Sequence, residues 1–172
     1  MTWGTKSDCR IPAPLLAVLG LGLLASACAA NVATPPGFVV LSEDSAYDYR
    51  ATTADGLVIA ARRIDNDPPG ELSFWERAIE NEMRFRGGYA LLESRDVRTR
   101  GGLRGRQLRF GHDESREPHL YYVTLFIGEE HSLWVFGSSK IYILEAGGPA
   151  PLVQARAADI EQAVREFDPA DL

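Results

Sequence analysis

The sequence has few cysteines: Cys9 and Cys28 are the two among 172 residues, and both lie near the N-terminus. If residues 1–27 are removed as a leader, the remaining 145 residues carry a single thiol at their first position. Such a chain cannot form an internal disulfide, so its stability must come from a packed core. A chain of this length buries enough surface to form an independent domain without cross-links.

The sequence also lacks an excess of basic residues. It contains 18 Lys and Arg against 24 Asp and Glu, a formal net charge of −6. Without residues 1–27 the balance becomes 16 basic against 23 acidic groups, a charge of −7. Proteins that bind nucleic acid draw affinity from neutralising phosphates. The negative charge therefore argues against nucleic acid as a partner, and the 45% of hydrophobic residues fit one globular domain.

A hydrophobic run long enough to span a membrane is missing as well. The uncharged stretch 11–27, "IPAPLLAVLGLGLLASA", is 17 residues long and is interrupted by Pro12, Pro14 and two glycines. A transmembrane helix needs about 20 apolar residues. Because Lys6 and Arg10 precede it and small residues follow it, this stretch is typical of the hydrophobic region of a signal peptide.

The small residues 25–27, "ASA", lead directly into Cys28, an arrangement that resembles the bacterial lipobox. In that motif the thiol is joined to diacylglycerol and becomes the first residue after cleavage, and two or three acyl chains suffice for stable anchoring. We therefore expect a lipoprotein signal peptide over 1–27, lipidation at Cys28 and a location in the cell envelope. Ala29, in place of Asp, favours the outer membrane over the inner one in a Gram-negative cell. Ordinary signal-peptidase cleavage and an uncleaved anchor are the alternatives.

Residues 28–37 are small and contain proline, which is typical of a tether, and we expect the globular domain over 38–168. The glycine-containing pairs Asp55-Gly56 and Gly101-Gly102 predict hairpin turns. Short apolar or alternating segments predict strands at 38–41, 47–53, 57–64, 89–100, 103–111, 119–128, 132–136 and 140–146.

Two helices are expected among these strands. Ser73 and Glu76 fit a capping box that would start the first helix, and Gly87-Gly88 would end it. The second helix is expected over 152–167, after Gly147-Gly148-Pro149 has ended the sheet. The order of strands, helix, strand meander and helix predicts an α+β fold, in which an antiparallel β-sheet is packed by two α-helices.

Several segments resemble the PsbP-like class, which includes photosystem PsbP subunits and bacterial DcrB-type proteins. They are "YDYRATTADGLVIAARRI", "SFWERAIENEMRFRGGYALLE", "GRQLRFGHDE" and "YILEAGG" followed by an amphipathic helix. The resemblance covers about residues 38–167. It implies an antiparallel sheet between helices and an accessory or binding role, and it transfers no functional residue to this chain.

The densest group of candidate binding residues is the basic hairpin, which carries Arg95, Arg98, Arg100, Arg104, Arg106 and Arg109. The four nearest its tip, Arg98, Arg100, Arg104 and Arg106, are the expected partner-binding residues. Because side chains alternate along a strand, Arg98 and Arg100 share one side, as do Arg104 and Arg106. Guanidinium groups placed in this way could bind phosphates or carboxylates of an envelope partner. The alternative is a solvated hairpin whose arginines pair with nearby Glu93 and Asp96.

A second candidate is the segment "GHDESREPH", in which His112, His119 and three carboxylates could bind a metal, with His131 in the next turn. The alternative is an exposed polar loop, and we expect no metal and no other cofactor. The motif Gly-x-Ser-x-Gly and a phosphate-binding loop are both missing from the sequence. We therefore expect a protein that is not an enzyme.

The sequence thus predicts an envelope lipoprotein with a non-catalytic binding or accessory role. Its expected partners are the membrane, through the lipid anchor, and an envelope protein or anionic envelope component. One alternative is a small-ligand carrier whose groove between sheet and helix is walled by Trp75, Tyr121 or Trp134. An envelope hydrolase or metal-dependent enzyme is the other.

Overall fold

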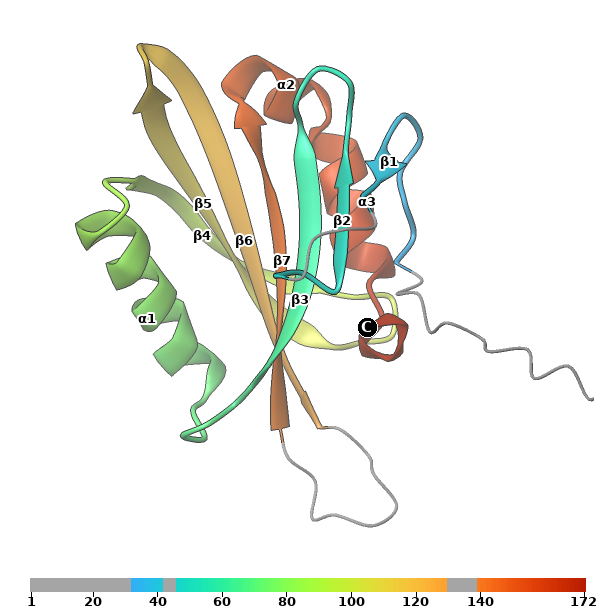
Figure 1. Ribbon diagram of the computed structural model, residues 1–172. Coiled ribbons are helices and arrows are strands. Elements are labelled where there is room, and N and C mark those ends of the chain that lie inside the picture. Colours follow the sequence, from blue (N-terminus) through green and yellow to red (C-terminus); the bar gives the residue numbers. More distant parts are fainter. Residues whose placement is uncertain (1–31, 42–45, 130–138) are drawn as a thin grey trace, which may run out of the picture.

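A computed structural model describes residues 32–41, 46–129 and 139–172. They form one seven-stranded antiparallel sheet in the order β1-β2-β3-β7-β6-β5-β4, with helices on both of its faces (Figure 1). The strands are β1 (Val39–Val40), β2 (Tyr49–Thr52), β3 (Val58–Asp65), β4 (Ala90–Arg98), β5 (Arg104–Glu114), β6 (Glu117–Glu129) and β7 (Ser139–Pro149). The helices are α1 (Leu72–Phe85), α2 (Ala150–Ala155), α3 (Ala157–Glu166) and the short 3₁₀ helix η1 (Pro169–Asp171).

The expected α+β architecture with an antiparallel sheet is confirmed. Both predicted glycine turns join neighbouring strands, and the second residue of each pair, Gly56 (φ 96°) and Gly102 (φ 90°), adopts the left-handed conformation that such turns require. Cys28 and the predicted strand 132–136 lie outside the described residues. No helix among the described residues is long and apolar enough to cross a membrane.

The prediction of a capping box at Ser73 is wrong. Helix α1 already begins at Leu72, its N-cap is Glu71, and no side chain caps it. Glu76 faces the sheet instead, where its carboxylate accepts hydrogen bonds from Arg106 Nε at 3.0 Å and Ser94 Oγ at 2.6 Å. In a capping box the glutamate would accept a hydrogen bond from a backbone amide at the start of the helix. Here the Glu76 carboxylate accepts from the charged Arg106 of the sheet instead.

The C-terminal part of the prediction also needs two corrections. The single helix expected over 152–167 is two helices, which meet at Arg156. Gly147-Gly148-Pro149 does not end the sheet, because Gly147 pairs with Tyr121 and Gly148 with Leu120 inside β7 and β6. At Gly147 a Cβ atom would lie 2.6 Å from the Tyr121 ring, so glycine is needed for the ring to pack here.

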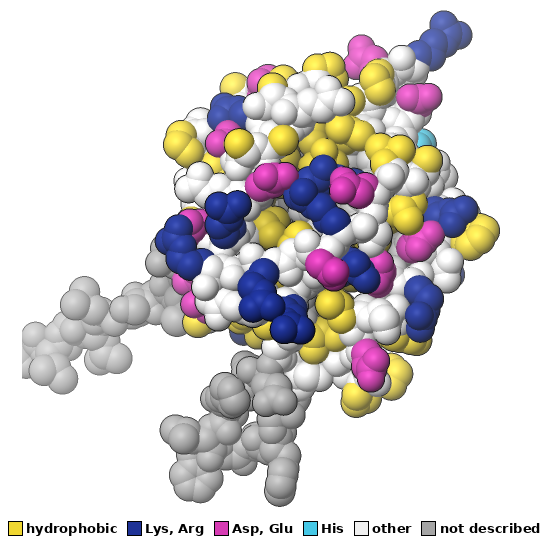
Figure 2. Space-filling view, turned by 180° about the vertical axis from the view of Figure 1, so that it is seen from behind, with side chains coloured by type: hydrophobic (Ala, Val, Ile, Leu, Met, Phe, Trp, Pro, Cys, Tyr) yellow, Lys and Arg dark blue, Asp and Glu magenta, His cyan; other side chains and the backbone are white. Residues whose placement is uncertain are grey.

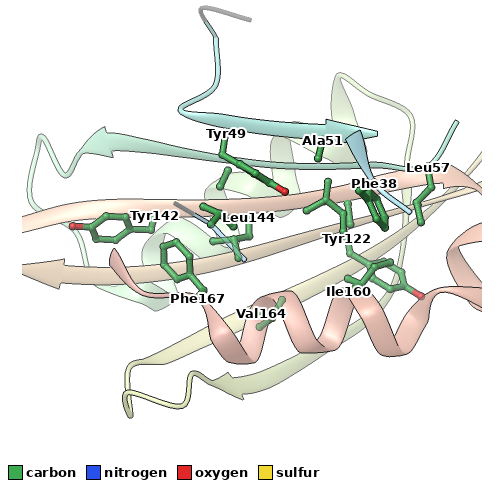
Figure 3. Packing of buried hydrophobic residues seen from close by; sticks show 14 of the residues in the cluster. Phe38, Tyr49, Ala51, Leu57, Tyr122, Tyr142, Leu144, Ile160, Val164 and Phe167 are labelled. Atoms are coloured by element: carbon green, nitrogen blue, oxygen red, sulfur yellow. The ribbon is translucent and has the colours of Figure 1, made fainter. Parts of the chain in front are cut away.

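Two hydrophobic clusters fill the space between the sheet and its helices. The larger one lies under α2 and α3, where Phe126 and Tyr142 pack against Phe167 (Figure 3). The smaller one lies under α1, where Trp75, Ile79 and Met83 pack on buried residues of β5, β6 and β7. The apolar stripe predicted for the first helix is thus used for packing on the sheet.

The described chain is packed against the domain from its first residue. Val32 is only 8% exposed and belongs to the larger cluster. Two residues later, the Thr34 hydroxyl accepts a hydrogen bond from the Tyr49 hydroxyl at 2.9 Å. The segment before Phe38, where the sequence predicts a tether, is therefore attached to the domain from Val32 onward.

Candidate functional site

The two faces of the sheet are covered to different extents. Helices α2 and α3 lie along one face, whereas α1 packs on the other face over β4, β5, β6 and the first part of β7 (Figure 1). The part of that face formed by β2, β3 and the end of β7 is left open by α1. The candidate site is the concavity at this place, which we call the sheet pocket.

The sheet pocket has a volume of about 270 Å³. Val58 and Gly147, which lie opposite each other on neighbouring strands, form an apolar floor together with Ala60, and Glu145 lies opposite Ala60. The full lining is Tyr47, Arg50, Val58, Ala60, Tyr89, His112, Glu114, His119, Leu120, Tyr121, Glu145, Gly147 and Gly148. An apolar floor with a few polar side chains at its edges is the usual composition of a ligand pocket.

An ion pair with a mostly buried carboxylate lies at one side of the sheet pocket. Arg62 Nη2 lies 3.0 Å from Glu145 Oε1, and the two side chains are 37% and 9% exposed. The Arg62 Nε atom is buried and has no hydrogen-bond partner among the described residues. Because buried donors are nearly always satisfied in proteins, this nitrogen is a position where a water or ligand oxygen would be stabilised.

Two tyrosines surround the Glu145 carboxylate. Burial raises the pKa of Tyr121 well above its usual value, and the charge of Glu145 and a hydrogen bond to it raise this pKa further. The pKa of Tyr47 is raised by the same causes in the same order, while Arg62 and Arg50 lower it. Both hydroxyls therefore remain protonated at neutral pH and donate to the Glu145 carboxylate, which leaves their oxygen atoms as hydrogen-bond acceptors.

Aromatic rings and cations alternate along the rim of the sheet pocket. The guanidinium carbons of Arg50 and Arg62 each lie 5.8 Å from the centre of the Tyr47 ring. Two further lining rings, Tyr89 and Tyr121, lie 5.9 Å apart, measured between ring centroids. These rings offer flat surfaces on which a planar or apolar ligand could stack.

His112 and His119 form the end of the sheet pocket. They face each other directly on β5 and β6, in a hairpin whose two-residue turn is Ser115-Arg116. The His112 ring packs on Tyr89 at 4.8 Å between centroids, and His119 Nε2 lies 3.8 Å from Glu114. The segment predicted as a metal site or a polar loop is thus mostly paired strand.

Within the described parts of the chain, no three His, Cys, Asp or Glu side chains come close enough to hold a metal ion. Asp113 points to the other face of the strand from His112, since side chains alternate. His131 lies outside the described residues.

The structure divides the four predicted arginines into two pairs. Arg106 binds Glu76 and Asp96, and Arg100 binds Glu166, so acidic side chains already neutralise both. Arg98 and Arg104 are exposed and lie directly opposite each other on β4 and β5. They line a groove of about 440 Å³ together with Leu72, Asp96, Val97 and Gly105.

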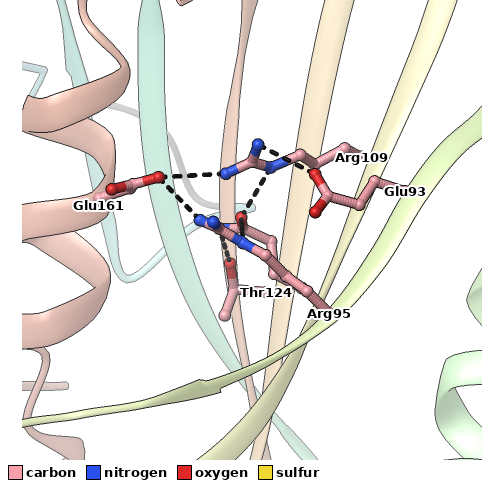
Figure 4. Close-up of polar contacts among 6 residues, drawn as sticks. Glu93, Arg95, Arg109, Thr124 and Glu161 are labelled. Carbon is pink, nitrogen blue, oxygen red and sulfur yellow. Dashed lines mark hydrogen bonds and ion pairs between the residues drawn. The ribbon is translucent and has the colours of Figure 1, made fainter.

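The two remaining arginines of the basic hairpin, Arg95 and Arg109, form a polar cluster under α3 (Figure 4). Arg95 and Arg109 both bind Glu161 Oε1, at 3.0 and 3.2 Å, and both donate to Gln107. Gln107 is fully buried and donates in turn to Thr124. Because its members satisfy one another, this cluster fixes α3 on the sheet.

Of the three side chains proposed as walls of a ligand groove, Tyr121 lines the sheet pocket. Trp75 lies outside it, because its ring packs under α1 and its Nε1 donates to Asn66 at 2.7 Å. Trp134 lies outside the described residues. Glu145 and Arg62 were missed, because two residues 83 positions apart leave no local signal in the sequence.

No protein-family model matches the chain, and no curated protein matches its sequence. Among solved structures, the fold is similar to that of LpqN, a protein involved in cell envelope biogenesis of Mycobacterium tuberculosis. The TM-score is 0.60 and the identity 14%, over 80% of each chain. A putative regulator of unknown function from Pseudomonas aeruginosa, PA94, has a TM-score of 0.49 and 13% identity over 77% of this chain and 81% of that one. At these identities the similarity to LpqN shows a shared fold.

Proposed function

We propose that the protein is a bacterial cell-envelope lipoprotein, attached to a membrane through Cys28, and that its domain has a non-catalytic binding role. The sequence before Cys28 and the fold shared with LpqN support the envelope location. The PsbP-like resemblance of the sequence supports an accessory or binding role. The outer membrane is the proposed site of attachment, because Ala29 follows the lipidated cysteine.

The sheet pocket is the single observation that favours a small ligand over a purely protein partner. Helix α1 leaves this part of the sheet open, and the floor of Val58, Ala60 and Gly147 is apolar. At its side, the Tyr47 and Tyr121 hydroxyls and the Arg62–Glu145 pair provide polar contacts. This combination suits a small molecule with an apolar or aromatic body and one polar group.

The anchor is tested by growing cells with labelled palmitate. We expect label on the wild-type protein and on Cys9→Ser, and none on Cys28→Ser. Cys9→Ser is the matched control, because it removes the other cysteine of the chain. Label that persists in Cys28→Ser would contradict lipidation at this residue.

The sheet pocket is tested with the fluorescent probe anilinonaphthalene sulfonate, which combines aromatic rings with one anionic group. Val58→Trp would fill the floor of the pocket, whereas Val39→Trp adds the same ring at a side chain that is 66% exposed on β1. We expect the pocket variant to bind the probe at least about tenfold more weakly and the control to bind it like the wild type, since a filled cavity excludes its ligand. Equal probe binding by all three proteins would rule out the sheet pocket as the binding site.

A further inference from the structure

Arg98 and Arg104 are two exposed arginines that lie close together without an acidic partner in the described parts of the chain. Their positions are directly opposite on β4 and β5, and like charges in such cross-strand pairs destabilise a sheet. Neither side chain has an ion-pair or hydrogen-bond partner among the described residues. Asp96, the acidic residue of the groove that they line, is already paired with Arg106 at 3.2 Å.

The hairpin end that carries these arginines lies where the chain enters the domain. Val97 and Leu103, which flank the turn, pack against the large hydrophobic cluster to which Val32 also belongs, on the sheet face opposite to the one that Arg98 shares with α1. Figure 1 shows the β4–β5 turn beside the start of the described chain and the C-terminus. Figure 2 shows Lys and Arg side chains at the lower left of the face seen from behind, with Asp and Glu side chains among them.

The position of Val32 limits how far the domain can move from a lipid anchor. Cys28 precedes Val32 by four residues, which span at most about 14 Å when fully extended. A domain anchored through Cys28 therefore keeps the surface around Val32 close to the lipid headgroups. The β5–β6 turn lies far from the β4–β5 turn, because the 11 residues of β5 that separate the two turns extend over roughly 35 Å.

We infer that Arg98 and Arg104 dock the domain on an anionic phospholipid surface by binding lipid phosphate groups. Guanidinium groups match the geometry of phosphate oxygens and bind them with paired hydrogen bonds. A chain with a charge of −7 after Cys28 is repelled by such a surface as a whole, so two adjacent arginines without an acidic partner among the described residues favour the approach of their own side. The inference rests on the proposed anchor at Cys28.

This orientation has a consequence for the sheet pocket. His112 and His119 place one end of the pocket near the β5–β6 turn, at the end of the strands opposite Arg104. With the Arg98–Arg104 end on the membrane, this end of the pocket is held away from the lipid and toward the aqueous compartment.

The test uses the lipidated protein, purified from membranes and reconstituted in vesicles. Gly101→Cys places a thiol at the β4–β5 turn, where a Cβ atom meets nothing closer than 3.7 Å, and Glu117→Cys places one at the far turn. Each thiol carries a fluorophore, and nitroxide-labelled lipid headgroups quench it. The vesicles contain phosphatidylcholine with or without phosphatidylglycerol.

We expect strong quenching at position 101 and weak quenching at position 117, only in vesicles with phosphatidylglycerol, and a loss of this difference at high salt. Arg98→Gln with Arg104→Gln should lower the docked-to-undocked ratio by roughly tenfold or more, since each arginine near an anionic surface contributes to binding. The matched control is Arg84→Gln with Arg86→Gln, which removes the same charge from the end of α1 and should leave the quenching unchanged.

Palmitate labelling of the same preparation separates the two proposals. A preparation without palmitate would overturn the anchor, and the orientation with it. A lipidated preparation in which positions 101 and 117 are quenched equally would overturn the orientation alone. Equal effects of the two double variants would show that net charge acts, and would overturn the role of Arg98 and Arg104.

Discussion

The Arg62 guanidinium lies 3.0 Å from the Glu145 carboxylate, and this contact joins β3 to β7 at the side of the sheet pocket. The two partners differ in their environment: Arg62 is 37% exposed, whereas Glu145 is 9% exposed. A mostly buried carboxylate is thus neutralised by a cation that still reaches water. Such pairs are costly to break, because one charge is then left in a place where solvent cannot compensate it.

We predict that Arg62→Met lowers the free energy of unfolding by about 2 kcal/mol, because it leaves Glu145 without its cation. The value is below that of a fully buried pair, since solvent screens the exposed part of Arg62. Adding Glu145→Gln should recover part of the loss, because the uncompensated charge is removed. Urea unfolding of the four proteins of this cycle measures the coupling. Strictly additive losses would show that the two side chains act independently.

Tyr121 should make the protein less stable at high pH. Its pKa in the folded chain is raised, chiefly by burial and then by Glu145, above the value of about 10 in an unfolded chain. The stabilisation is therefore complete below pH ~10 and is lost as the pH rises above it, because only the unfolded chain releases the proton. Tyr121→Phe should reduce this loss by up to about 1.4 kcal/mol per pH unit.

The measurement is urea unfolding of wild type and Tyr121→Phe at pH 7 and at a series of values above 10. The comparison at pH 7 gives the cost of losing the hydroxyl and serves as the control. A smaller loss should persist in the variant, because burial also raises the pKa of Tyr49. Parallel stability curves for the two proteins would contradict a raised pKa at Tyr121.

Asn66 should be a strong contributor to stability for a side chain in a loop. It is 7% exposed and accepts hydrogen bonds from Gly70 N at 2.9 Å and from Trp75 Nε1 at 2.7 Å. Its amide nitrogen donates to Ser139 Oγ at 2.8 Å. We expect Asn66→Ala to lower the free energy of unfolding by about 3 kcal/mol, because several partners lose their hydrogen bonds at once.

The control is Asn81→Ala, on the exposed side of α1, which should change the free energy of unfolding by less than about 0.5 kcal/mol. Equal effects in thermal unfolding would contradict this role.

The sheet could be predicted from the sequence because its signals are local. Asp55-Gly56 and Gly101-Gly102 mark turns by their conformational freedom, and alternating residues mark the strands between them. The start of α1 was missed because the local capping signal of Ser73 and Glu76 competes with Arg106, which lies 30 residues away along the chain. A charged partner brought in by the fold overrides a preference within one helical turn.

The candidate site was harder to predict for the same reason. The sequence identified the arginines of the β4–β5 hairpin, but Arg100 and Arg106 are neutralised by Glu166 and Glu76, which lie on helices far along the chain. The sheet pocket depends on where α1 stops covering the sheet, and residue spacing contains no information on this. Tyr121 could be named as a candidate wall because an aromatic residue in a strand is visible in the sequence, whereas its position opposite Gly147 is set by the pairing of β6 with β7.

Gly147 connects the stability of β7 to the shape of the sheet pocket. Its φ is not in the left-handed region, so alanine would fit the backbone, but the new Cβ atom would lie 2.6 Å from Tyr121 Cδ2 and 3.5 Å from Leu120 O. The ring would have to move, and its neighbours Tyr89 and Phe110 limit its movement to the side of the pocket. We therefore expect Gly147→Ala to lower the free energy of unfolding by about 1–2 kcal/mol, which is typical of overpacking.

The same variant should also weaken the binding of anilinonaphthalene sulfonate, because the displaced Tyr121 ring occupies part of the cavity. Gly101→Ala is the matched control: its Cβ atom meets no described atom closer than 3.7 Å, and it lies outside the pocket. We expect the control to keep wild-type probe binding and to change stability by less than about 0.5 kcal/mol. If Gly147→Ala lost stability but bound the probe normally, the ring would have moved away from the cavity, and Tyr121 would not be a wall that determines what the pocket accepts.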